Sequence, residues 1–269
     1  MALRTFKRVV VISDLHCGHI VGLTPPGWLV GNGDEVTNDK TKSKKFEIVR
    51  RQCWDFYSKT LKALQPIDIL IVNGDCIDGR GVRSGGTEEL EINRDRQCNM
   101  AIECIREANA KEIRMIYGTP YHVGDTEDWE NIIADRLGVK IGSHEWFNVN
   151  GLIIDCKHHL GSSSVPQGRY AALAREILWN DEWSIQHEQP LADILIRSHT
   201  HYSNYIGSRG RLAIITPALQ GMGSKFGARI CSGTVDFGLI HFDINDKGEY
   251  SWAYHIAKLS SQAAKPVIL

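Results

Sequence analysis

Aspartate and histidine recur in four short patterns that suit the ligation of a divalent metal ion. In chain order these patterns are Asp14-Leu15-His16, Gly74-Asp75, His158-His159 and His199-Thr200-His201. Alternate residues of an extended chain point to the same side, so both members of an Asp-x-His or His-x-His pair can reach one ion. Each pattern alone also fits an ordinary hydrogen-bonded turn. All four in one chain predict a metal centre, because gathered carboxylates repel one another unless a cation neutralises them.

Each pattern follows a run of residues that has the composition of a strand. The four runs are Arg8–Ile12, Ile67–Val72, Leu152–Lys157 and Ile194–Arg197. The first two are apolar and β-branched, which is typical of parallel strands covered on both faces. Ligand sites in open α/β sheets form at the carboxyl ends of such strands. The sequence therefore predicts that the four patterns meet at strand ends.

The segments between these runs predict an α/β fold with two sheets. Apolar residues recur at helical spacing over 46–64, and further helices are expected over 89–110, from 125 or 126 onward, and over 169–179. A weaker strand is expected over 113–117. Asn150-Gly151 and the turn at 246–248 each separate two β-type runs, which indicates hairpins in the second half. Two packed sheets flanked by helices satisfy this order.

The composition fits a single domain covering residues 1–269. The net charge of −1 gives no global electrostatic reason to expect a nucleic-acid or membrane partner. No run approaches the roughly 18 apolar residues needed to cross a bilayer, so a cytoplasmic protein is expected. The seven cysteines form no Cys-x-x-Cys pair, which indicates reduced, buried thiols rather than disulfides or a zinc ribbon.

The ordered set of patterns resembles the calcineurin-like metallophosphoesterase superfamily. The resemblance extends from residue 8 to about residue 256 and includes Gly74-Asp75-x-x-Asp78 beside the other three patterns. The segments 13–19 (Ser-Asp-Leu-His-Cys-Gly-His) and 215–220 (Ile-Thr-Pro-Ala-Leu-Gln) are most similar to phage and prophage members. That similarity implies a phage-encoded protein in the host cytoplasm. The implied fold is a four-layer αββα sandwich, with two mixed sheets flanked by helices.

The resemblance also implies a dinuclear metal centre that hydrolyses phosphoesters. Two ions would lower the pKa of a bridging water, neutralise phosphate oxygens and orient in-line attack on phosphorus. Oxygen and imidazole ligands suit Mn, Zn or Fe, and the lack of thiolate ligands argues against a structural zinc site. The implied ligands are Asp14, His16 and His201 for one ion, Asp75 as a bridge, and His199 with either His158 (slightly favoured) or His159 for the other.

One stretch departs from the family pattern. The family usually carries Gly-Asn-His-Asp/Glu after the third strand, where Asn binds the second metal and His assists the leaving group. Here the stretch reads Tyr117-Gly-Thr-Pro-Tyr-His122, so the Asn is absent and the His is displaced by two residues. Thr119 or water would fill the vacant position, or His122 would itself bind metal. As a catalytic residue, His122 is expected to act as the general acid.

Basic and aromatic residues near the metal patterns indicate where a phosphoester would bind. A loop at about 18–45, with Trp28 and a basic run at its end, is expected to form a lid or insertion. These residues could bind a polyanion and stack on a base, or simply pack the loop and begin a helix. Arg80, Arg83 and Arg169 are better placed to bind phosphate, although each could equally pair with a carboxylate.

Three functions fit these features. The first expectation is a phosphodiesterase or nuclease whose substrate is nucleic acid or a nucleotide. The second is a phosphomonoesterase acting on a nucleotide or phosphoprotein. The third is a metal-binding module without turnover, which the altered stretch at 117–122 would explain. No membrane partner is expected, and the sequence gives no oligomeric state.

Overall fold

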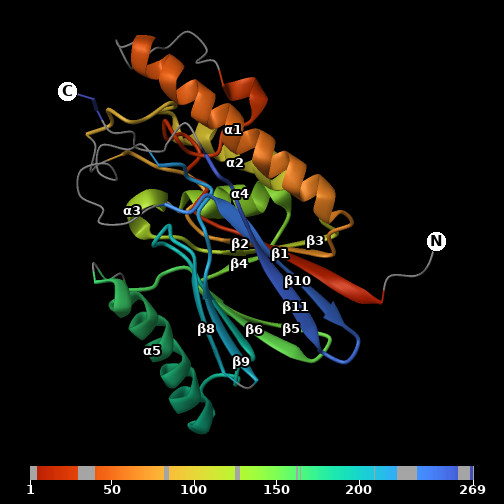
Figure 1. Ribbon diagram of the computed structural model, residues 1–269. Coiled ribbons are helices and arrows are strands. Elements are labelled where there is room, and N and C mark those ends of the chain that lie inside the picture. The colour runs from red at the N-terminus through yellow and green to blue at the C-terminus, as the bar shows by residue number, and fades with distance from the viewer. Residues whose placement is uncertain are drawn as a thin grey trace.

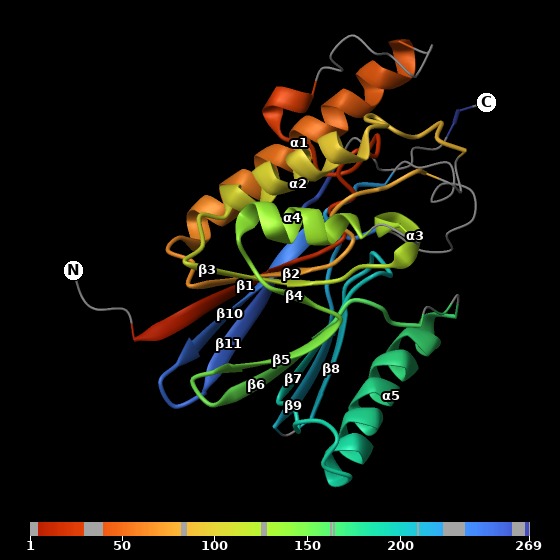
Figure 2. The same cartoon turned by 180° about the vertical axis from the view of Figure 1, so that it is seen from behind.

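The computed structural model describes residues 5–29, 40–81, 85–124, 128–161, 163, 165–208, 210–222, 235–259 and 267–268. In these residues two mixed β-sheets pack face to face and helices cover their outer faces (Figures 1 and 2). The predicted two-sheet sandwich flanked by helices is therefore confirmed. Among the described residues, no helix combines the length and the apolar character that a membrane span requires.

The first sheet has the strand order β11-β10-β1-β2-β3-β4. Strands β1 to β4 are parallel neighbours, so their carboxyl ends meet at one edge. The hairpin of β10 and β11 joins the sheet antiparallel to β1. The strands are β1 (Phe6–Ile12), β2 (Ile69–Asn73), β3 (Glu112–Ile116), β4 (Ile141–Gly142), β10 (Gly238–Asn245) and β11 (Tyr250–Ile256).

The second sheet has the strand order β5-β6-β7-β9-β8. Strands β6, β7 and β9 run parallel, whereas β5 and β8 lie antiparallel at the edges. The predicted Asn150-Gly151 turn joins β5 to β6, and both residues have the positive φ that a type I′ turn requires. The strands are β5 (His144–Val149), β6 (Leu152–Lys157), β7 (Ile194–Arg197), β8 (Asn204–Ser208) and β9 (Arg211–Ile215).

The residues of β1 pack into two hydrophobic cores, one on each face of the first sheet. Val9 and Val11 face the second sheet, where they join the cluster that contains Ile154 and Phe242. Val10, the next residue along, faces the helices on the other side of the sheet. This alternation explains why β1 is apolar throughout, since parallel strands covered on both faces lose the usual polar positions.

Helices α1 (Lys40–Leu64), α2 (Arg94–Glu107) and α4 (Trp129–Leu137) cover the outer face of the first sheet, and α5 (Pro166–Ile185) covers that of the second (Figures 1 and 2). Two short helices, η1 (Pro26–Trp28) and α3 (Pro120–Val123), lie in loops. Tyr57 and Leu61 anchor α1 in the core between the helices and the first sheet, and Leu173 anchors α5 in the core between that helix and the second sheet.

The helix boundaries differ from the expected ones because capping side chains select them. The helix expected over 89–110 begins at Arg94, where the Asn93 side chain accepts a hydrogen bond from the backbone N–H of Arg96. Helix α4 begins at Trp129 after its N-cap Asp128, whereas residues 125 and 126 lie outside the described residues. The helix expected over 169–179 covers 166–185. The β8–β9 hairpin, β4 and α3 were not predicted.

The expected lid at about 18–45 is described only in part. Its first half is packed into the core, because Val21 and Leu23 are buried and Arg50 donates to the carbonyls of Ile20 and Leu29. Residues 30–39 lie outside the described residues, and the basic run forms the start of α1. The lid itself therefore stays a prediction.

Candidate metal centre

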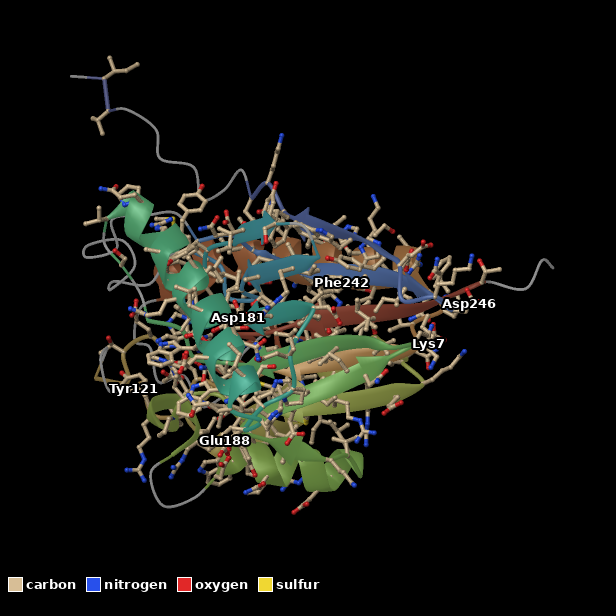
Figure 3. The ribbon with its side chains drawn as sticks, turned by 90° about the horizontal axis from the view of Figure 1, so that it is seen from below. Lys7, Tyr121, Asp181, Glu188, Phe242 and Asp246 are labelled. Carbon is tan, nitrogen blue, oxygen red and sulfur yellow. The ribbon has the colours of Figure 1, made fainter. Side chains whose placement is uncertain are left out.

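The loops that follow β1, β2, β6 and β7 bring six of the predicted residues together in two adjacent groups. Within each group the potential ligand atoms all lie within 4.8 Å of one another. These loops lie at the carboxyl ends of the strands, near α3, whose Tyr121 lies at the end of the molecule opposite Lys7 and Asp246 (Figure 3). The groups are Asp14, His16 and His201, and Asp75, His158 and His199.

The ligand atoms of the first group, two imidazole nitrogens and one carboxylate oxygen, surround a small volume. His201 Nε2 lies 3.2 Å from Asp14 Oδ1 and 3.1 Å from His16 Nε2. His16 Nε2 lies 4.0 Å from the same Asp14 oxygen. Nitrogen and oxygen atoms that face one another in this way are arranged as the ligands of a shared cation.

The second group has the same character and touches the first. His158 Nε2 lies 3.1 Å from Asp75 Oδ2, and His199 Nδ1 lies 3.9 Å from that oxygen. His158 Nε2 is also 3.8 Å from Asp14 Oδ1. The same histidine nitrogen thus lies within 4 Å of a carboxylate oxygen of each group, so the two groups are adjacent.

Three buried polar atoms of the cluster show whether cations fit it. Asp14 Oδ1, His158 Nε2 and His199 Nδ1 are buried and have no hydrogen-bond partner among the described residues. A buried polar atom left in this state costs about 1–3 kcal/mol, so such atoms are rare in native structures. All three face the cluster, and divalent cations that take oxygen and imidazole ligands would satisfy them. The donor set therefore fits a metal pair.

The backbone at the ligands is strained. Asp14, His16, Asp75, His199 and His201 all have φ between 44° and 73°. Non-glycine residues rarely adopt this left-handed conformation, and when they do it is often at functional sites. Main-chain hydrogen bonds between the loops hold it: the N–H of Asp14 donates to the Gly74 carbonyl at 2.9 Å, and that of His16 to the Asp75 carbonyl at 3.0 Å.

The electrostatics of the cluster couple its acids to its histidines. Burial alone would raise the pKa of Asp14 and Asp75, but His158 acts together with His201 at Asp14 and with His199 at Asp75, and both pKa values fall below the usual range. Burial opposes the charge on His158, yet Asp75 and Asp14 raise the pKa of His158 to about 10. Without metal, a proton on His158 thus does part of the neutralisation, and a cation would displace it.

The rings of two ligands are oriented from behind. His16 Nδ1 lies 2.9 Å from Asp78 Oδ1, and His158 Nδ1 lies 2.6 Å from the carbonyl of Asn73. Metal-binding histidines usually donate their second N–H to a carboxylate or carbonyl in this way, which leaves the other nitrogen free for the metal. Burial and then His122 lower the pKa of His16 to about 4, so its ring is neutral and able to ligate.

The two adjacent histidines have different surroundings. His158 is buried in the second group, whereas His159 is exposed, with its ring 4.9 Å from that of His199. The alternation of β6 offers a signal that could have separated them, since Ile154 and Cys156 face the other sheet and His158 continues their parity. His159 has the parity of the opposite face.

His122 lies on the side of the first group, not the second. Its ring meets that of His16 edge-on at 4.4 Å, and its Nδ1 lies 3.0 Å from the Asp78 carbonyl oxygen. His16, Asp78 and His122 form a third set of ligand atoms within 4.8 Å of one another. Asp78 thus contacts both histidines. The Gly-Asp-x-x-Asp pattern includes Asp78 but does not predict this role.

The altered stretch after β3 packs directly on Asp75. Thr119 donates to Asp75 Oδ1 from its backbone N–H at 2.6 Å and from its hydroxyl at 3.1 Å. Glycine is required before it, because a Cβ on Gly118 would lie 2.2 Å from Asp75 N and Oδ1. The buried Glu130 of α4 accepts from the N–H groups of Cys76 and Gly118. No sequence pattern pointed to Glu130.

The arginines predicted to bind substrate are less closely placed. Arg80 is exposed, and Arg83 lies outside the described residues. The guanidinium carbon of Arg169 lies over the ring of Tyr202, 4.0 Å from its centroid. Tyr202 is next in sequence to the candidate ligand His201. The structure thus gathers the metal-binding patterns and His122, and brings Arg169 beside their loop.

Comparison with known proteins gives similarity of structure only. No family model matches the chain, and no curated protein matches it in sequence. Vacuolar Protein Sorting 29 from Cryptosporidium parvum is similar over 94% of this chain and 98% of its own, with 13% identity and a TM-score of 0.49. The zinc complex of Vps29 from Entamoeba histolytica covers 93% of this chain and 98% of its own, with 15% identity and a TM-score of 0.45.

A structure titled as a novel archaeal phosphodiesterase is also similar. It covers 92% of this chain and 99% of its own, with 14% identity and a TM-score of 0.44. Likeness at these values says nothing about activity. The function of this chain must therefore be argued from its own side chains.

Proposed function

We propose that this protein is a phosphoester hydrolase that depends on two divalent cations. The observation that carries the proposal is the pair of adjacent groups, each with three oxygen and nitrogen ligands and no thiolate. Three protein ligands leave positions open for water and substrate, which is the pattern of catalytic rather than structural sites. Mn, Zn or Fe suits such ligands, and Asp75 would be among the residues that hold the pair.

The residues around the ligands hold the centre in its working arrangement. When bound, the two cations would neutralise phosphate oxygens and lower the pKa of a water, so that the resulting hydroxide could attack phosphorus. Thr119 fixes the Asp75 carboxylate with two donors, and Asp78 fixes the ring of His16. Preorganised groups of this kind need no rearrangement during the reaction, which is the main source of electrostatic catalysis.

Proton transfer to the leaving oxygen is assigned to His122. Its side chain is 17% exposed and stands beside His16, so it borders the first group and solvent together. With Nδ1 held by the Asp78 carbonyl, Nε2 of the imidazolium is the nitrogen free to give up a proton.

The substrate in this proposal is a phosphodiester of nucleic acid or of a nucleotide. Arg169 supports a phosphate group as the ligand, because its Nε is buried without a hydrogen-bond partner among the described residues. Its guanidinium makes a cation–π contact with Tyr202, and among the described residues no ion pair with a carboxylate neutralises it. A planar guanidinium matches the oxygens of a phosphate in pairs.

The proposal is tested by hydrolysis of a chromogenic phosphodiester and a matched monoester. Metal-stripped protein, with and without added Mn²⁺, is compared with Asp75→Asn and with Asp246→Asn, an exposed turn residue, as the matched control. We expect Mn²⁺-dependent turnover with a higher rate on the diester, lost at least about a hundredfold in Asp75→Asn and unchanged in Asp246→Asn. Turnover that survives in Asp75→Asn would contradict the proposal. A higher rate on the monoester would show that the enzyme is a phosphomonoesterase instead of a phosphodiesterase.

One observation favours a second candidate, a metal-binding module without turnover. Thr119 stands where the family pattern has its metal-binding Asn. Its side chain has a hydroxyl in place of the amide oxygen, and that hydroxyl donates to Asp75. Metal content measured on the reloaded protein separates the two candidates. Two Mn²⁺ per chain without cleavage of either ester would favour the module.

A further inference from the structure

A cavity of about 320 Å³ lies between α5 and the outer face of the second sheet. Small-molecule sites in proteins begin at about 300 Å³, so this volume suits a small ligand. None of the six candidate metal ligands lines it. Its walls come from β5, β6, β7, α5 and the loop after α5: His144, Asp155, Lys157, Glu176, Trp179, Asn180, Trp183, Gln189 and Arg197.

The charges in this cavity balance one another. Arg197 donates to Asp155 Oδ1 at 2.6 Å and to Glu176 Oε2 at 2.8 Å, and Lys157 Nζ lies 3.0 Å from the same Glu176 oxygen. Two cations thus meet two carboxylates. A phosphate or another ion would have to break these pairs, so the lining favours an uncharged polar ligand.

One buried oxygen in this network lacks a donor. Asp155 is fully buried, and its Oδ1 is approached by His144 Nε2 at 2.8 Å as well as by Arg197. Its Oδ2 has no hydrogen-bond partner among the described residues. Asp155 lines the cavity, and a carboxylate oxygen only accepts, so a ligand that satisfies Oδ2 brings an N–H or O–H group.

The mouth of the cavity is aromatic. Trp179 and Trp183 are 51% and 38% exposed, and their rings lie 6.2 Å apart at an interplanar angle of 22°. Two nearly parallel indoles open to solvent on one helix present flat apolar surface beside a polar floor. Planar rings stack on such surfaces, and nucleic-acid bases do so whatever their sequence.

We propose that this cavity binds a nucleobase, with the ring on the indoles and an exocyclic amino group donating to Asp155 Oδ2. The cavity is joined to the metal centre by short chain segments: Lys157 directly precedes the ligand His158, and Arg197 lies two residues before His199. As the base site for the substrate of the metal centre, the assignment rests on the proposed function. As a nucleoside site it does not.

The test is calorimetric titration of the metal-free protein with adenosine, guanosine, cytidine and purine riboside, which lacks the amino group. We expect an amino-bearing nucleoside to bind about tenfold more tightly than purine riboside, since a hydrogen bond to a charged group is worth that much. The double variant Trp179→Ala, Trp183→Ala should weaken binding by at least about tenfold. Leu178→Ala, 67% exposed on the same helix and outside the cavity, is the matched control.

A second variant keeps the test valid if the tryptophan double variant fails to fold. Asp155→Asn keeps the shape of the side chain and should abolish the preference for the amino-bearing nucleoside, while the tryptophan pair remains exposed and unaltered. No binding of any of the four nucleosides at millimolar concentration would overturn the proposal, and so would unchanged affinity in the tryptophan variant. Nucleoside binding without ester hydrolysis would sink the proposed function alone. Hydrolysis of nucleotide esters with unchanged KM in the tryptophan variant would sink the base site alone.

Discussion

The candidate ligands depend on contacts made behind them. Asp78 and the Asn73 carbonyl orient the rings of His16 and His158, and Thr119 holds Asp75. Residue types and spacing were enough to predict five of the six side chains that the structure gathers, and they left His158 and His159 open for the sixth. Asp78 belonged to the Gly-Asp-x-x-Asp pattern, but the Asn73 carbonyl and the contact of Thr119 with Asp75 were not predictable, because neither a backbone carbonyl nor a threonine hydroxyl carries a pattern of its own.

Titration of His158 gives a prediction at the same scale. In the metal-free protein Asp75 and Asp14 raise the pKa of His158 from 6.5 to about 10, against the effect of burial. The folded state therefore binds more protons than the unfolded chain over this range, and stability falls as pH rises from 6.5 toward 10, by up to about 1.4 kcal/mol per pH unit.

Urea unfolding of chelator-treated protein between pH 6.5 and 10 measures this slope. The variant His158→Gln should flatten the profile, whereas His159→Gln, the exposed neighbour, should leave it unchanged. An equal slope in all three proteins would show that the proton is not held by His158.

Among the elements, α4 has a role that its sequence does not reveal. The helix was expected from its apolar residues, and its packing on α2 follows from Ile133. Its Glu130, however, is a charged residue that is fully buried, with one oxygen on the N–H of Cys76 and the other on that of Gly118. One carboxylate thus ties the loop after β2 to the loop after β3. Helical periodicity predicts which residues are apolar and says nothing about a buried acid that pairs across 54 residues of chain.

The variant Glu130→Gln should loosen both loops. The amide can accept from only one of the two N–H groups, so we expect a loss of about 1–3 kcal/mol in the free energy of unfolding and weaker Mn²⁺ binding. Chemical unfolding and metal titration measure the two effects. Asp135→Asn, on the exposed face of the same helix, is the control. Unchanged metal affinity in Glu130→Gln would limit the residue to a purely structural role.

Across the whole molecule, the candidate metal ligands lie where the two sheets meet. Asp14, His16 and Asp75 follow strands of the first sheet, and the three other ligands follow β6 and β7 of the second. The sequence predicted both sheets, because the order of strands and hairpins is local information. The β8–β9 hairpin and the short β4 were missed, since their pairing depends on neighbours that sequence spacing does not reveal.

Because ligands come from both sheets, metal binding should stabilise the fold as a whole. Mn²⁺ at about one hundred times its dissociation constant would add about 2.7 kcal/mol to the free energy of unfolding. Thermal denaturation of stripped protein should therefore show a Tm that rises with Mn²⁺ concentration, and by less in Asp75→Asn. A Tm that ignores Mn²⁺ in the wild-type protein would contradict binding to the folded state.

The division of ligands between the sheets has a consequence for synthesis. The aspartates and His16 leave the ribosome early, whereas His199 and His201 are made only after α5 and β7. Until then the nascent chain carries Asp14 and Asp75 without the histidines that complete either group. An ion that needs all six of these ligands could therefore be bound only after the second sheet has formed against the first.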